Sequence, residues 1–160
     1  MSNERFPITP DGFEKIREEL KRLITVERPK VIAMIAYARS LGDLSENAEY
    51  DTAKDRQGFI EARITDLEAK VSRSEVIDPS KIVVTDRVVF GVHVTLEDSD
   101  SGDTVTYQLV GSEESEPESG RISITSPIGR ALIGKSLDEE VVVRTPGGIR
   151  ELIVLSIKAG

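Results

Sequence analysis

The 160-residue chain contains no cysteine and no tryptophan, and it has one histidine, four phenylalanines and three tyrosines. The lack of cysteine excludes disulfides, thiolate catalysis and cysteine-based zinc sites. The single histidine, His93, alternates with valines in an expected strand. One histidine without any cysteine leaves too few residues for a conventional catalytic triad or a zinc centre. So few aromatic residues favour a helical hairpin plus a small domain over one large core.

Long hydrophobic runs and an excess of basic residues are also missing. No apolar run approaches the roughly 20 residues that span a membrane, and "MSNERFPITP" lacks the apolar core of a signal peptide. We therefore expect a cytoplasmic protein without a membrane partner. The net charge of −8 argues against a broad surface that scans nucleic acid, because phosphate binding needs concentrated Lys and Arg.

Helical periodicity dominates the first half of the chain. Thr9 and Pro10 suit a helix start, and apolar residues then recur at steps of three and four. Pro29 is expected to kink or break this helix just before it, after which the apolar spacing resumes. The positions are Phe13, Ile16, Leu20, Leu23, and then Val31, Ile35, Ala38 and Leu41.

A second helical pattern follows after a few residues and predicts a coiled-coil seam with one polar position. Its members are Tyr50, Ala53, Gln57, Ile60, Ile64, Leu67 and Val71. Because the connection is short, the two helices must be antiparallel. Residues 1–78 are therefore expected to form a long antiparallel coiled-coil hairpin, with a linker over 79–86.

Residues 87–160 change to the alternation typical of strands. "RVVFGVHVTLED", "TVTYQLVG" and "RISIT" predict strands, "SPIGRALIGK" predicts one short helix, and "EEVVVRTPGGIRELIVLSI" predicts a hairpin. The acidic "SEESEPESG" is interpreted as an exposed loop. The fold class is α+β: the helical hairpin followed by a small, mainly antiparallel sheet domain.

The turn of the hairpin, "GDLSENAEYD", carries Asp43, Glu46, Glu49 and Asp51 with no base among them. Asp43 and Glu46 fit an acidic capping box that starts the second helix. Capping needs only one or two acids, however, and projecting acids repel one another. Two carboxylates are too few to hold Mg²⁺ alone, but they can share an ion that another molecule partly binds. Both interpretations stay open on these residues alone.

Three bases, Lys54, Arg56 and Arg63, follow the tip along the second helix. Exposed bases on a helix mostly solvate it, but a narrow basic track beside the tip could also guide the end of a nucleic acid. Acids lie between these bases, namely Asp55 and Glu61, and Asp66 follows.

The segment "RPKVIAMIAYARSLGDLSENAEYDTAKDRQGFIEARITDLEAKV" resembles the hairpin of the Gre family of bacterial transcript-cleavage factors. "VTDRVVFGVHVTL", "ISITSPIGRALIGK" and "VVVRTPGG" are similar to the second domain of that family, in the same order. The resemblance implies a C-terminal domain like that of FK506-binding proteins. It also implies a partner, the backtracked elongation complex of RNA polymerase, whose secondary channel the hairpin enters and whose cleavage of its own RNA the factor stimulates.

On this resemblance, Asp43 and Glu46 are the tip acids that act in catalysis and share the second Mg²⁺ only within the polymerase complex. Asn47, Glu49 and Tyr50 support the shape of the tip. The basic track guides the 3′ end of the nascent RNA, and the loop at Ser126 and Pro127 docks on the polymerase. The factor itself is expected to be a monomer and no enzyme, with no cofactor bound stably alone. The GreB branch has a broader basic patch, so the chain fits the other branch, which prefers short backtracked RNA.

Three other functions compete with this interpretation. A paralogue that enters the same channel and inhibits would depart from the paired Asp and Glu at the tip, which this chain keeps. A prolyl isomerase or chaperone would need an aromatic pocket, yet residues 80–160 hold only Phe90 and Tyr107 as aromatic residues. A dimerising coiled-coil adaptor would need a helix from a partner chain to bury its seam. Here the two predicted helices of one chain can bury each other's seam residues.

Overall fold

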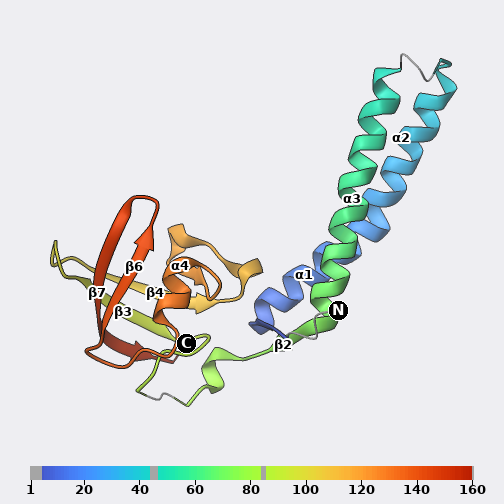
Figure 1. Ribbon diagram of the computed structural model, residues 1–160. Coiled ribbons are helices and arrows are strands. Elements are labelled where there is room, and N and C mark those ends of the chain that lie inside the picture. Colours follow the sequence, from blue (N-terminus) through green and yellow to red (C-terminus); the bar gives the residue numbers. More distant parts are fainter. Residues whose placement is uncertain (1–4, 44–46, 84–85, 160) are drawn as a thin grey trace. The chain divides into compact units, whose positions relative to one another are not determined.

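Phe13–Arg73 form a helical hairpin in the computed structural model, which describes residues 5–43, 47–83 and 86–159 (Figure 1). One arm comprises α1 (Pro10–Arg22), a π-helical stretch (Leu23–Glu27) and α2 (Arg28–Ser40), and the other is α3 (Ala48–Arg73). Within the described ranges, no helix has both the length and the apolar character needed to cross a membrane.

The predicted seam lies between the two arms. Seam residues on both arms are buried, and Val31, Ile60 and Ile64 form the centre of a cluster that Leu20 and Leu23 extend. Gln57, the polar seam position, is half-buried. Leu41 is an exception: its side chain is 52% exposed, because the arm ends at Ser40 and the chain turns away. The buried seam side chains are Ile16, Val31, Ile35, Ala38, Ala53, Ile60, Ile64 and Leu67.

Of the two outcomes expected before Pro29, a kink or a break, the break is wrong, because the first arm continues through this position with a π-helical distortion. The backbone N–H of Arg28 donates to the carbonyl of Leu23, five residues back, which is the bond of a π-helical turn. Proline lacks a donor and its ring collides with the carbonyl four residues earlier in a regular α-helix. A widened turn ahead of Pro29 accommodates both defects without ending the helix.

The second unit contains Ser74–Gly160 and, unexpectedly, the chain up to Gly12. Its five-stranded sheet has the order β5-β4-β3-β7-β6, with α4 (Pro127–Leu132) after β5. All neighbours are antiparallel except β4 and β5, which are parallel. The strands are β3 (His93–Asp98), β4 (Thr104–Val110), β5 (Arg121–Ser123), β6 (Glu140–Thr145) and β7 (Gly148–Lys158).

The strand expected from Arg87 begins only at His93, because Gly91 interrupts the extended run with a φ of +89°. A side chain at Gly91 would also crowd Ile82 and Pro79. Pro79 begins a short 3-10 turn (Pro79–Lys81) inside the expected linker. The core beneath the sheet is aliphatic and includes Val88, Val94, Leu109, Leu132 and Leu152.

A small parallel sheet in the second unit was not predicted from the sequence. It pairs β1 (Phe6–Ile8) with β2 (Ser74–Val76), and the N–H of Ile77 adds a bond to the carbonyl of Ile8. Three-residue strands are too short to display an alternating pattern, which explains the omission.

The acidic loop is not simply exposed, because the Glu114 side chain is buried. The loop forms two 3-10 turns, Ser112–Glu114 and Pro117–Ser119. The Glu114 carboxylate accepts bonds from the N–H and hydroxyl of Thr9 and from the N–H of Gly111, and Arg121 lies 3.6 Å away. Thr9 in turn caps α1 by accepting from the N–H of Gly12. Within the second unit, Glu114 therefore joins the end of the N-terminal segment to the acidic loop.

We expect Glu114→Ala to lower the free energy of unfolding by about 2–4 kcal/mol, because it leaves two backbone N–H groups and a hydroxyl without their acceptor. That loss corresponds to a fall in Tm of roughly 5–12 °C, measured by calorimetry. Glu118→Ala, an exposed acid in the same loop, is the control and should melt like the wild type. Equal melting temperatures for the two variants would contradict a stabilising role for the hydrogen bonds that Glu114 accepts.

Candidate functional site

The tip of the hairpin is the turn between α2 and α3 (Figure 1). At the end of α2 the N–H of Leu41 donates to the carbonyl of Ala38 at 3.2 Å. Gly42 follows with a φ of +110°, a left-handed conformation that glycine adopts without strain, and it redirects the chain. Asp43 then lies exposed ahead of α3. Glu46 lies outside the described residues.

Asn47, and not Asp43, caps the second helix. Its side-chain oxygen accepts from the N–H of Tyr50 at 3.0 Å, the usual bond of an N-cap residue to the third helical position. Its amide nitrogen donates to the carbonyl of Ala38 at 2.6 Å, across the turn. α3 begins at Ala48, so Asp43 is too far along the chain to be its N-cap, and Glu46, the other member of the expected capping box, lies outside the described residues.

The other residues expected to support the tip are arranged around this cap. Tyr50 is half-buried, and its ring lies 6.0 Å from the guanidinium carbon of Arg39, within reach of a cation–π contact. Glu49 and Asp51 are exposed in the first turn of α3, where the helix dipole favours negative charge. Asn47 and Tyr50 thus join the two arms, whereas Glu49 faces solvent.

The described residues of the tip do not form a metal site by themselves. No group of three or more His, Cys, Asp or Glu side chains in the part of the chain that the structure describes could hold an ion. An exposed carboxylate such as Asp43 can supply one or two of the six oxygen ligands that Mg²⁺ prefers. This donor fits a shared ion better than a resident one.

The three bases of the expected track differ in their surroundings. Arg63 is bound by both carboxylate oxygens of Glu19, at 2.8 and 3.1 Å, and by Asp66. Arg56 donates to Glu27 at 3.2 Å. Lys54, in contrast, donates to the neutral amide of Gln57. Carboxylates therefore neutralise the bases farther from the tip, while the base nearest to it keeps its charge exposed.

Arg39 is a candidate that the sequence analysis missed. With Lys54 and Gln57 it lines a small hollow of about 230 Å³ between α2 and α3, close to the tip. Among the residues that the structure describes, its guanidinium contacts the ring of Tyr50 and pairs with no carboxylate, so its charge is available to an anion. The signal was present in the sequence, since Arg39 lies in the last turn of α2, but only the pairing of the arms brings it to Lys54.

Another cross-arm pair lies farther from the tip. Arg28 binds Glu61 through two bonds of 2.8 and 2.9 Å. The hydrogen bond from this guanidinium lowers the pKa of the Glu61 carboxyl below its ordinary value. Both side chains are partly exposed, so the pair fixes the alignment of the arms more than it stabilises them.

Ser126 and Pro127 begin α4 in the second unit. The Ser126 hydroxyl donates to the carbonyl of Ser123 at 2.6 Å and accepts from the N–H of Gly129 at 3.1 Å, so it caps the helix. Gly129 fits because a side chain there would collide with the carbonyl of Ser123. Ser126 is thereby committed to the local fold, while Pro127 is exposed beside it.

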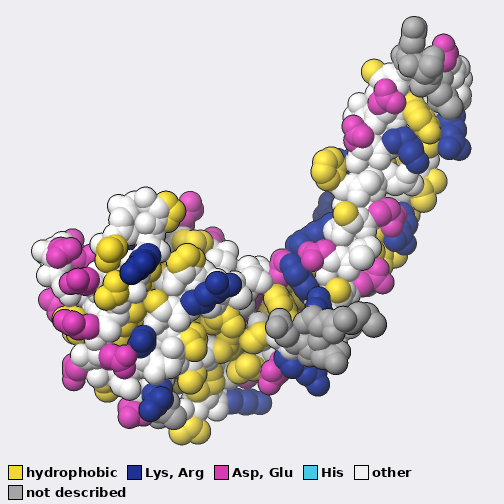
Figure 2. Space-filling view, viewed as in Figure 1, with side chains coloured by type: hydrophobic (Ala, Val, Ile, Leu, Met, Phe, Trp, Pro, Cys, Tyr) yellow, Lys and Arg dark blue, Asp and Glu magenta, His cyan; other side chains and the backbone are white. Residues whose placement is uncertain are grey.

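An open apolar hollow of about 580 Å³ adjoins α4 in this unit. It is lined by the apolar residues Phe90, Ile124 and Ile133 and by the basic residues Arg87 and Arg130. Figure 2 shows hydrophobic side chains gathered with basic ones on the visible face of this unit. An apolar floor with cationic residues suits a protein segment that is both apolar and acidic.

Comparison with known proteins covers almost the whole chain. Residues 6–76 match the family described as transcription elongation factor, N-terminal, and residues 83–159 match the one described as transcription elongation factor, GreA/GreB, C-terminal. The curated transcription elongation factor GreA of Syntrophotalea carbinolica is 54% identical over 97% of this chain and 98% of its own. That of Verminephrobacter eiseniae is 55% identical over 94% and 96%.

Among solved structures, the GreA factor homolog 1 (Gfh1) of Thermus thermophilus is 27% identical to the chain. The alignment covers 98% of this chain and 100% of that one, with a TM-score of 0.46.

The dual role of Asn47 can be tested by hydrogen exchange at the Tyr50 amide. We expect Asn47→Ala to speed this exchange roughly tenfold, because the N–H loses its acceptor at a cost of about 1 kcal/mol or more. Asn47→Asp keeps an acceptor for Tyr50 but loses the donor to Ala38, so it should protect that amide almost as well as the wild type. Unchanged protection in Asn47→Ala would refute the cap.

Proposed function

Because the chain belongs to the GreA/GreB family of transcription elongation factors, we propose that it acts on RNA polymerase from within the secondary channel. There the hairpin stimulates the Mg²⁺-dependent cleavage by the polymerase of its own backtracked RNA. The observation that carries this proposal is the exposed Asp43 at the end of a helical hairpin whose second helix is already capped by Asn47. The N-cap of α3 is therefore a residue other than the tip acid.

Asp43 and Glu46 together supply carboxylate oxygens to an ion that the polymerase also binds. This chain holds no ion alone, since two carboxylates leave most of an octahedral shell to water. An ion held by these carboxylates and the polymerase would supply activation of the attacking water and stabilisation of the displaced oxygen. The polymerase is therefore the enzyme, and the factor contributes ligands.

Arg39 and Lys54 bind the phosphates of the displaced RNA 3′ end beside the tip. They share one hollow, and within the described ranges neither side chain is paired with a carboxylate, which supports this role. Arg56 and Arg63 hold the arms through Glu27 and Glu19 and reach the RNA only if these pairs open. The small number of available bases agrees with a preference for short backtracked RNA.

The second unit docks on the polymerase, and we infer that its fold is of the FK506-binding-protein type. Ser126 and Pro127 shape the start of α4, and the adjoining hollow receives the partner. The factor acts as a monomer in the cytoplasm. The three alternatives, an inhibitory paralogue, a prolyl isomerase or chaperone, and a dimerising adaptor, gain no support from the relatives, which are named transcription elongation factors.

Asp43→Asn and Glu46→Gln are each expected to reduce cleavage of backtracked RNA at saturating factor by about a hundredfold or more. An amide is a poorer Mg²⁺ ligand and withdraws a negative charge, which costs about 3 kcal/mol of transition-state stabilisation. The measurement is single-turnover cleavage of 3′-labelled RNA in a stalled complex. Asp51→Asn, the same change on an exposed acid of α3, is the control and should stay within about threefold of the wild type.

Near wild-type cleavage by both tip variants would refute the metal role. A further control omits the polymerase, and labelled RNA with factor and Mg²⁺ should then remain intact. Robust cleavage without the polymerase would place the catalyst in this chain instead.

Arg130→Glu should weaken binding to the polymerase roughly tenfold or more, because it puts a like charge against an acidic partner. Competition binding to the elongation complex measures this change, and cleavage should recover at saturating factor because the tip is intact. Arg144→Glu makes the same charge reversal on the exposed side of β6, away from the hollow, and serves as the control. Equal affinities for the two variants would exclude the hollow as the docking surface.

A further inference from the structure

A long apolar groove runs along the hairpin and has no role in the tip chemistry. Near the tip it is a hollow of about 540 Å³ where Met34 and Tyr37 of α2 meet Ala48 and Thr52 of α3. It continues into a second hollow of about 550 Å³, which shares Thr52 and extends past Phe59 to Leu23 and Arg63. We call this surface the outer groove. From residue 48 to 63 it is roughly 22 Å long, at about 1.5 Å per helical residue.

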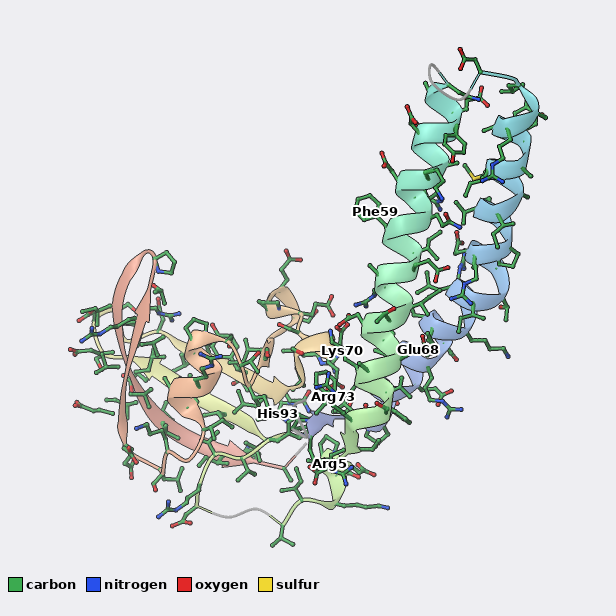
Figure 3. The ribbon with its side chains drawn as sticks, turned by 45° about the vertical axis from the view of Figure 1, so that its right-hand side comes forward. Arg5, Phe59, Glu68, Lys70, Arg73 and His93 are labelled. Atoms are coloured by element: carbon green, nitrogen blue, oxygen red, sulfur yellow. The ribbon has the colours of Figure 1, made fainter. Side chains whose placement is uncertain are left out.

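The outer groove exposes large apolar side chains. Phe59 is 77% exposed, Tyr37 61% and Met34 37%. Figure 3 shows Phe59 pointing away from α3 into solvent, not toward the other arm. The seam is already filled by other residues, so these three are not needed to pair the helices. Large exposed apolar side chains that line one continuous groove are typical of interaction surfaces.

The charges of the outer groove cancel, which argues against nucleic acid as its ligand. Near the tip, the hollow is lined by one cation, Lys30, and one anion, Glu49. Farther along, Arg56 is paired with Glu27 and Arg63 with Glu19, and Asp55 adds a negative charge. The hollow with Arg39 and Lys54 has a different lining and keeps its positive charge. Phosphate binding needs such uncompensated cations, so an RNA strand prefers that hollow over the outer groove.

We propose that the outer groove docks an amphipathic helix of RNA polymerase, of about 15 residues, whose apolar stripe carries little net charge. A groove between two helices accepts a third helix by the same ridge-and-groove packing that builds bundles, with anchors spaced by one and two turns. Thr52 and Phe59 are two turns apart and provide that spacing on α3. A second copy of this chain is a poorer occupant, since a net charge of −8 repels another −8.

The partner in this inference rests on the proposed function, but the contact itself has an independent test. A photoreactive benzoylphenylalanine replaces Phe59, and the full-length factor is irradiated in a stalled elongation complex. We expect a cross-link to a polymerase subunit, mapped by mass spectrometry to a helix with an apolar stripe. The same group at Val26, an exposed apolar position of the hairpin that lines neither hollow, should give at most a tenth of that yield. Cross-links from position 59 mainly to RNA, to a second factor or to a charged loop would each overturn the proposal.

Affinity provides the second arm of the test. Phe59→Gln should weaken binding to the elongation complex roughly tenfold, while Phe59→Leu keeps most of the affinity and Val26→Gln matches the wild type. Since Phe59 is exposed, a melting curve should be unchanged, which separates docking from folding. A wild-type factor that binds the elongation complex but does not stimulate cleavage would refute the proposed function. The cross-link and the affinity measurements would still show whether the outer groove contacts the polymerase. Wild-type affinity in Phe59→Gln would overturn the proposed docking.

Discussion

The pairing of the two arms along one aliphatic seam is the constraint on which the rest of the hairpin depends. Ala38 and Ala53 bring the arms close near the tip, and Ile60, Ile64 and Leu67 fill the wider part. Burying each of the large side chains stabilises the pair by about 1.5–3 kcal/mol. Because this one stripe satisfies both helices, their outward sides are free to differ in charge and polarity. The seam thereby also fixes which outward residues of α2 meet which of α3.

That register separates two surfaces that the linear sequence mixes. Lys54 and Arg56 are two residues apart, yet Lys54 lines the hollow with Arg39 while Arg56 lines the outer groove and binds Glu27. Neighbouring helical residues point about 100° apart, so two positions along α3 suffice to change face. A charge-balanced apolar groove and a basic hollow can therefore coexist on one pair of helices, each suited to a different ligand.

Sequence periodicity predicted the long-range architecture and failed where single contacts decide. The three-and-four spacing from Ala53 to Leu67 predicted the seam, because burial of a stripe is a collective property of many residues. Glu114 looked like one acid among several in an exposed loop, and only the fold brings Thr9 to it. Arg39 and Arg63 looked equivalent to other bases until their partners were known. Charged side chains take their roles from tertiary neighbours, which no local pattern encodes.

The tip illustrates how structure and function can be assigned to different residues of one short turn. If Asp43 were the cap of α3, its carboxylate would accept helix N–H groups and could not also face a shared ion. Asn47 removes this conflict: one amide accepts from Tyr50 and donates to Ala38, so it both starts α3 and holds it to α2. A neutral side chain performs this task without adding to the repulsion among Asp43, Glu49 and Asp51. The start of α3 therefore does not need one of these acids as its N-cap, and their negative charge can serve a partner.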